Sequence, residues 1–226
     1  MLKIGILISG RGSNMQALID AARQKDFPAQ IACVIANDPD AKGLERAQAA
    51  NIPTSVINHK DFGKDRQKFE QVLDAKLVEA GVQLVCLAGF MRLLTPWFVD
   101  RWRDRLINIH PSLLPAFPGL HTHQAAIDYG VKFAGCTVHF VRAEMDHGPI
   151  IIQAAVPVLS DDTADALAAR ILEAEHKIYP QAVRLIAENR VNVMDERVFI
   201  TNAGAPPQIA YNPADGSPLA KSAAAQ

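Results

Sequence analysis

The stretch that decides the fold is LKIGILISGRGSN at residues 2–14. Leu2–Ile8 is a continuous apolar run of strand type, and helical spacing follows over residues 15–23. An apolar strand that passes through a short loop of small residues into a helix is typical of a parallel sheet covered on both faces. The beginning of the chain therefore predicts an α/β sheet.

The same alternation continues along the chain. Further strands are predicted over residues 30–36, 53–57, 83–88 and 105–109, with helical segments over 41–50 and 61–80. Because crossovers between parallel strands are right-handed, the expected product is a Rossmann-like, doubly wound, mostly parallel sheet with helices on both faces.

The alternation changes after residue 130. Strands are predicted over residues 136–141 and 150–158, and only residues 142–149 connect them. Two strands with so short a connection are expected to pair antiparallel, because a parallel pair needs a long crossover.

The C-terminal part is predicted to hold one long helix over residues 163–189. Asp162 is the expected N-cap, and Pro180 is expected to kink the helix. Short apolar runs near Val191 and Val198 indicate a small hairpin. We expect a single domain over residues 1–204. Residues 205–226 are rich in Pro, Ala, Ser and Gly and predict a disordered tail.

Composition excludes several classes of protein. The 226 residues carry a net charge of −1, which gives no overall attraction to nucleic acid. No apolar window approaches the length of a bilayer span. The three cysteines are isolated, so we expect buried thiols, a reducing compartment and a cytoplasmic protein.

The loop Ser9–Asn14 is a candidate phosphate site. Its small residues let backbone N–H groups approach an anion, and the following helix points its positive end at the same place. Met15 stands where the third glycine of GxGxxG would be, and the GK[ST] of a P-loop is missing. A single phosphate on Gly12, Ser13 and Asn14 is therefore favoured, and a helix start capped by Ser13 or Asn14 is the alternative.

Asn108, His110 and Asp146 form the candidate catalytic set. Residues 108 and 110 of a strand face the same side. An Asn donor for an oxyanion and a His that donates or carries a proton suit acyl transfer. Asp146 beside His110 would orient the ring. Each has a structural alternative: Asn108 and His110 could satisfy backbone groups, and Asp146 could simply form a turn.

Metal catalysis is not expected. The sequence has neither an HExxH motif nor a cluster of Cys and His at ligand spacing.

The order of five motifs resembles the phosphoribosylglycinamide formyltransferase family over about residues 1–200. The motifs are ISGRGSN at 8–14, LAGFMRLLTPWF at 87–98, LINIHPSLLPAFPGLHTHQAAI at 106–127, CTVHFVRAEMDHGPII at 136–151 and AEHKIYP at 174–180. HPSLLP is shared by a wider group of formyltransferases, whereas the first loop, the block at 136–151 and the short chain narrow the resemblance.

The resemblance implies a formyltransferase fold and a role in one-carbon metabolism and purine (IMP) biosynthesis. It implies 10-formyltetrahydrofolate as the formyl donor and co-substrate, and the amine of N1-(5-phospho-D-ribosyl)glycinamide, glycinamide ribonucleotide, as the acceptor. It also implies catalytic roles for Asn108, His110 and Asp146.

Binding residues are likewise implied by the resemblance. The ribonucleotide and its phosphate would contact Gly12, Ser13, Asn14, Met15 and Glu175. The folate would contact Arg66, Met91, Arg92, Leu93, Leu94, Asn108, Arg142, Ala143, Glu144, Met145 and Asp146.

Three other functions remain as alternatives. A methionyl-tRNA formyltransferase is expected to carry an added C-terminal domain, and a formyltetrahydrofolate hydrolase an added N-terminal domain. A non-catalytic folate- or nucleotide-binding protein is expected to lack part of the catalytic set. The expected partners are the two small-molecule substrates, without nucleic acid or membrane. A homodimer stays open, because no feature of the sequence determines the oligomeric state.

Overall fold

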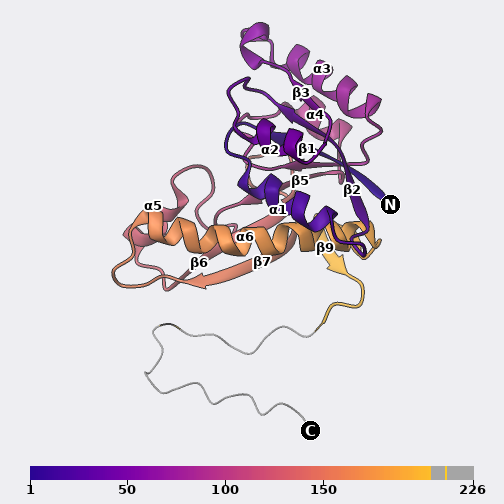
Figure 1. Cartoon of the computed structure of the whole chain (residues 1–226). Helices are drawn as coiled ribbons and strands as arrows, with labels where there is room; N and C mark the ends of the chain where they lie inside the picture. Colours follow the sequence, from indigo (N-terminus) through magenta and orange to yellow (C-terminus); the bar gives the residue numbers. More distant parts are fainter. Residues whose placement is uncertain (205–211, 213–226) are drawn as a thin grey trace.

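A computed structural model describes residues 1–204 and Asn212, so the tail predicted at 205–226 otherwise lies outside the described residues (Figure 1). Its centre is a seven-stranded sheet with the order β3-β2-β1-β4-β5-β6-β7. The strands are β1 (Leu2–Ile8), β2 (Ala29–Ala36), β3 (Thr54–Val56), β4 (Leu84–Leu87), β5 (Leu106–His110), β6 (Phe133–Phe140) and β7 (Ile150–Pro157).

Five strands run parallel, β6 runs in the opposite direction, and β7 runs again in the direction of the first five. The pairs among β1 to β5 are all parallel, whereas β6 pairs antiparallel with both β5 and β7. This arrangement confirms the predicted doubly wound, mostly parallel sheet with an antiparallel C-terminal region. A separate hairpin of β8 (Val191–Met194) and β9 (Arg197–Ile200) confirms the small hairpin.

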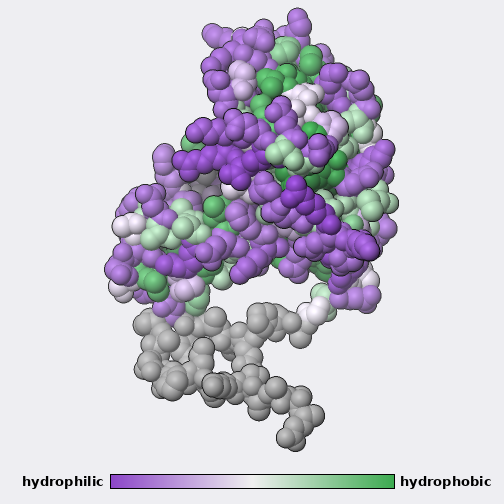
Figure 2. Space-filling view, in the orientation of Figure 1, coloured by the Kyte–Doolittle hydropathy of each residue, from purple (hydrophilic) through white to green (hydrophobic). Residues whose placement is uncertain are grey.

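Helices cover both faces of the sheet. One hydrophobic cluster joins the sheet to four helices, α1 (Ser13–Ala22), α2 (Gly43–Ala49), α5 (Thr122–Tyr129) and α6 (Ala164–Ala187). A second cluster joins the other face to α3 (Arg66–Glu79) and α4 (Pro96–Arg101), and the 3-10 helix η1 (His59–Phe62) precedes α3. Hydrophilic residues predominate on the outer sides of α1 and α6 in Figure 2, as expected for helices that bury one face.

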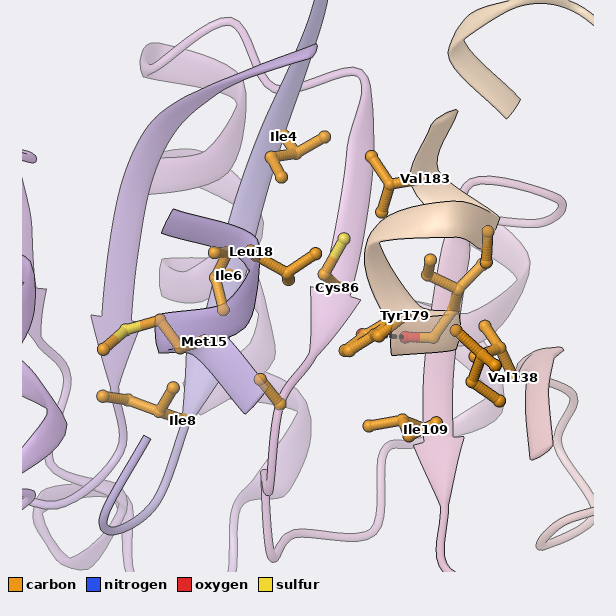
Figure 3. Packing of buried hydrophobic residues seen from close by; sticks show 14 of the residues in the cluster. Ile4, Ile6, Ile8, Met15, Leu18, Cys86, Ile109, Val138, Tyr179 and Val183 are labelled. Atoms are coloured by element: carbon orange, nitrogen blue, oxygen red, sulfur yellow. Dashed lines mark hydrogen bonds between the residues drawn. The ribbon is translucent and has the colours of Figure 1, made fainter. Parts of the chain in front are cut away.

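The long helix α6 is fixed to the strands of the sheet by its buried face. Figure 3 shows Tyr179 and Val183 of α6 in the cluster that also contains Ile109 of β5 and Val138 of β6. The Tyr179 hydroxyl is fully buried and donates a hydrogen bond to the carbonyl oxygen of Leu87, at 2.9 Å. A buried phenol with a partner stabilises one seating of the helix on the sheet.

The start of α6 differs from the prediction. Thr163, and not Asp162, is the N-cap, and its side chain accepts a hydrogen bond from the Ala166 N–H at 3.2 Å. Asp162 instead forms two hydrogen bonds with the Arg170 guanidinium, at 2.7 and 2.8 Å. Asp162 and Thr163 are adjacent, and either could serve as the N-cap. The ion pair with Arg170 holds Asp162 outside the helix and leaves the N-cap position to Thr163. The helix continues across Pro180 to Ala187.

No helix within residues 1–204 combines the length and the apolar character that crossing a membrane requires.

We expect Thr163→Ala to lower the free energy of unfolding by about 1 kcal/mol, because a capping hydrogen bond is lost. In a chain of this size the melting temperature should fall by about 2–4 °C. Thermal unfolding followed by circular dichroism measures this change. Ser160→Ala, at an exposed serine in the preceding turn, is the matched control. Equal melting temperatures for Thr163→Ala and the wild type would show that Thr163 does not cap α6.

Candidate active site

The predicted catalytic residues meet where β5 ends. Asn108 and His110 project from this strand, and the antiparallel register places His139 of β6 directly opposite Asn108. The Asn108 side-chain nitrogen lies 3.4 Å from Nε2 of His139. The pairing of β5 with β6 therefore adds an imidazole to the two side chains that β5 supplies.

Asp146 returns to this cluster from the turn between β6 and β7. Its Oδ1 lies 3.6 Å from Nδ1 of His110 and 4.0 Å from Nε2 of His139. Its Oδ2 accepts a hydrogen bond from the Gly119 N–H at 2.8 Å. Asp146 has a φ of 58°, a left-handed conformation that Asp tolerates better than most residues. The structure thus brings the three predicted side chains together.

The two nitrogens of His110 have different surroundings. Nε2 lies 3.1 Å from the carbonyl oxygen of Phe117, so Nε2 carries a proton and donates. Nδ1 faces the carboxylate of Asp146, and the residue is only 5% exposed. The imidazole of His110 therefore lies between a backbone carbonyl and a carboxylate.

His139 is a site residue that the sequence prediction missed. Its Nδ1 lies 2.9 Å from the carbonyl oxygen of Phe140, so the proton sits on Nδ1. The other nitrogen is then an acceptor for the Asn108 amide and fixes the direction of its N–H groups. Burial lowers the pKa of His139, which favours the neutral ring that this role requires. Only the strand register could have revealed this contact.

The loop before α1 has the open N–H groups that an anion needs. Gly12 is the N-cap with a φ of 70°, and no side chain caps this helix, which contradicts the alternative of a start capped by Ser13 or Asn14. A β-carbon on Gly12 would lie 3.0 Å from Gly43 Cα, so only glycine fits. Met15 is fully buried in the core, so its side chain is not available to a ligand.

Glu175 of α6 meets Asn14 of α1. The Asn14 side-chain N–H group donates to a Glu175 oxygen at 2.7 Å, and Glu175 is 5% exposed. Burial raises the pKa of Glu175, and the hydrogen bond from Asn14 opposes that rise. The Asn14 side-chain oxygen is also buried and has no hydrogen-bond partner among the described residues. A buried acceptor without a partner suits a ligand that brings a donor.

Most of the predicted folate residues fall into two segments, whereas Arg66 begins α3 and Asn108 lies in β5. In the first, between β4 and α4, the apolar side chains of Met91 and Leu93 are 70% and 62% exposed. Arg66 lines one small hollow together with Arg92 and Leu93. Leu94 is partly buried against the second hydrophobic cluster.

The second segment follows β6. Ala143, Glu144 and Met145 are exposed, so they are available to a ligand. The Arg142 guanidinium, in contrast, binds Asp104 at 2.7 Å and Glu196 at 2.5 Å. These ion pairs engage the Arg142 side chain, so only its main chain remains for the folate contact that was predicted.

One hollow lies apart from the candidate catalytic cluster. It has a volume of about 690 Å³, runs along α1 and α6 and includes Ser13 and His176, but none of the three predicted catalytic residues lines it. Over residues 1–204 and Asn212, no three His, Cys, Asp or Glu side chains are grouped as metal ligands would be. The cysteines Cys33, Cys86 and Cys136 are free and buried, as predicted.

Comparison with known proteins shows the family. The sequence profile of the formyl transferase family matches residues 2–183. The chain belongs to this formyl transferase family. It is 43% identical over 206 residues to the phosphoribosylglycinamide formyltransferase of Haemophilus influenzae, covering 91% of this chain and 97% of the relative. The enzyme therefore falls among relatives of similar length that carry that name.

Two further relatives extend the comparison of this formyl transferase. The human trifunctional purine biosynthetic protein adenosine-3 is 49% identical over 191 residues, or 84% of this chain, and the chain spans only 19% of that relative's length. The crystal structure of glycinamide ribonucleotide transformylase 1 from Symbiobacterium toebii aligns with a TM-score of 0.86 at 50% identity, covering 88% of this chain and 94% of that one.

We expect Glu175→Gln to stabilise the fold at about pH 7.5. Because burial raises the pKa of Glu175, the folded state binds its proton more tightly than the unfolded state. The wild type therefore loses stability as pH rises from 4.5, the ordinary value, through the raised pKa. A glutamine keeps the acceptor for Asn14 without the charge, so this loss disappears.

The stability of the variant should exceed that of the wild type at about pH 7.5, and the difference should shrink toward about pH 4.5. Urea unfolding at several pH values measures both. Glu173→Gln, at an exposed position of the same helix, controls for the loss of a carboxylate. A variant that is less stable than the wild type at about pH 7.5 would contradict the conclusion that burial of the Glu175 carboxylate destabilises the fold at this pH.

Proposed function

We propose that the chain transfers the formyl group of 10-formyltetrahydrofolate to the amine of glycinamide ribonucleotide, a step of purine biosynthesis. The observation that carries this proposal is the cluster of Asn108, His110 and Asp146 at the carboxyl edge of the sheet. Ligands of open α/β sheets bind at this edge, where the strand order changes direction. The names of the relatives support the same reaction.

The ribonucleotide would bind on the α1 side of the cluster. Its phosphate suits the uncapped N–H groups after Gly12, because the positive end of α1 points there. Asn14 and Glu175 then offer a buried oxygen acceptor and a buried carboxylate to the donors of the sugar and glycinamide groups. Contacts remote from the reacting amine would hold it in line for attack.

The folate would bind on the opposite side, against the two exposed segments. Exposed Met91, Leu93 and Met145 are apolar and suit a flat heterocycle. Arg66 and Arg92 share one hollow beside Leu93, and their positive charges suit the carboxylates of a folate tail.

Formyl transfer requires one bond to form and one to break. The lone pair of the amine attacks the formyl carbon, and the carbonyl oxygen gains a negative charge. The Asn108 amide and a His110 N–H would stabilise this oxyanion, and the loss of one such donor typically costs about 100- to 1000-fold in turnover. The bond from carbon to the folate N10 then breaks, while the proton lost by the amine is returned to N10.

Asp146 would act through His110. Its carboxylate faces Nδ1 and stabilises the imidazolium while the proton is in transit. His110 Nε2 donates a hydrogen bond to the Phe117 carbonyl, so donation from Nε2 to the oxyanion requires the segment around Phe117 to shift. Buried free thiols suit a reducing compartment, and we place this activity in the cytoplasm.

The test is a spectrophotometric assay of folate release from a 10-formyl folate, with and without glycinamide ribonucleotide. We expect release only when the ribonucleotide is present, because the amine is the nucleophile. Release at the same rate without the ribonucleotide would identify a hydrolase. A folded chain that binds both ligands and releases nothing would identify a binding protein. Either of these two results would contradict the proposed transfer.

A further inference from the structure

Ser9 connects the two binding regions of the proposed reaction. It is the residue between β1 and the loop that leads to the phosphate site. Its N–H donates to the Gly89 carbonyl oxygen at 3.1 Å, and its hydroxyl oxygen accepts a hydrogen bond from the Met91 N–H at 2.7 Å. Met91 begins the exposed segment on which the folate is proposed to bind. A change in the position of Ser9 must therefore move Met91.

The Ser9 hydroxyl group also donates a hydrogen bond, to the side-chain oxygen of Asn37 at 2.5 Å. Asn37 follows β2 and is 4% exposed, so no solvent competes for this bond. The hydroxyl accepts once and donates once, which leaves its preferred partners unambiguous. Hydrogen bonds linked in this way polarise one another.

His59 lies at the other end of the chain. Its Nδ1 lies 2.8 Å from the Asn37 carbonyl oxygen and 3.1 Å from the Asn37 side-chain nitrogen. The ring forms a hydrogen bond with Asn37 in either tautomer. A protonated Nδ1 donates to the Asn37 carbonyl, and an unprotonated Nδ1 accepts from the Asn37 side-chain amide. His59 also lines the hollow that contains Arg66 and Arg92. The hydrogen-bonded network of Ser9, Asn37 and His59 thus reaches the proposed folate region at two places, at Met91 and at the hollow beside Arg66.

The far end of the folate segment is held independently. The buried carboxylate of Glu70 accepts hydrogen bonds from the N–H and the hydroxyl of Thr95, the former at 2.7 Å. Glu70 belongs to α3, which packs in the second hydrophobic cluster. The segment is therefore held at both ends, by Glu70 at Thr95 and by Ser9 at Met91.

From this geometry we propose that Ser9, Asn37 and His59 are positioning residues that couple the two substrate sites. A phosphate that orders the loop after Ser9 also orders Met91 and His59, so the folate loses less conformational freedom when it binds second. Coupling of this kind is reciprocal, so the folate must strengthen ribonucleotide binding by the same factor. The inference rests on the proposed function, since it concerns the two substrates of that reaction.

Calorimetry on the full chain tests the coupling. The probes are glycinamide ribonucleotide and tetrahydrofolate, which lacks the formyl group and cannot react. The folate Kd of the wild type should fall on the order of fivefold or more when the ribonucleotide saturates its site, as is typical of coupled sites. The coupling is measured by the Kd ratio, which is the folate Kd without the ribonucleotide divided by the folate Kd with it. Ser9→Ala should bring this Kd ratio close to one, because the Met91 N–H loses its acceptor and the Asn37 side-chain oxygen loses its donor.

The Kd ratio distinguishes coupling from simple damage to the folate site. Folate binding that is weakened equally with and without the ribonucleotide leaves the Kd ratio unchanged. Ser55→Ala, the same substitution in β3 of the same sheet, should keep the wild-type ratio. If Ser9→Ala does not fold, His59→Ala tests the coupling in its place. His59 is partly exposed, and its replacement should still lower the Kd ratio.

A wild-type ratio close to one, or a wild-type ratio retained in Ser9→Ala, would overturn the coupling while leaving the proposed function intact. A wild type that binds neither ligand would overturn both.

Discussion

The antiparallel pairing of β6 with β5 is the interaction on which the rest of the site depends. Its register holds His139 opposite Asn108, and the turn that follows β6 returns Asp146 to His110. Because side chains alternate along a strand, a shift of one residue would turn His139 to the opposite face. The reversal therefore turns the edge of an ordinary parallel sheet into a site with two imidazoles and a carboxylate. A sixth parallel strand would not provide the short return that Asp146 uses.

The site is assembled from polar groups whose burial opposes folding. Burial raises the pKa of Glu175 and lowers the pKa of His139, so the charged form of each is disfavoured. Partners compensate for part of this cost: Asn14 donates to Glu175, and the Phe140 carbonyl accepts from His139. Such groups are stable only because two large hydrophobic clusters hold the surrounding elements in place. The same rigidity holds His139 against the Asn108 amide, and electrostatic stabilisation of a transition state requires donors that are fixed in this way.

Local patterns predicted the parallel strands and the common direction of Asn108 and His110, because apolar runs and strand alternation are properties of neighbouring residues. The approach of Asp146 to His110 depends on the turn after β6, which no such pattern fixes. The helices α4 and α5 were missed, since segments of six and eight residues are too short to be stable without packing against the sheet. The N-cap prediction at Asp162 was wrong because Arg170, about two turns further along, binds Asp162 and leaves the N-cap position to Thr163. His139 and the Ser9 network depend on contacts between strands and loops that no local pattern contains.

In the proposed mechanism Asp146 acts through His110 and not as an independent group. A double-mutant cycle on kcat/KM measures this coupling, with Asp146→Asn, His110→Asn and the double variant in the formyl-transfer assay. We expect Asp146→Asn to cost little further activity once His110 has been replaced, because residues that act as a unit are strongly non-additive. Costs that multiply in the double variant would contradict it, because Asp146 would then contribute without the imidazole.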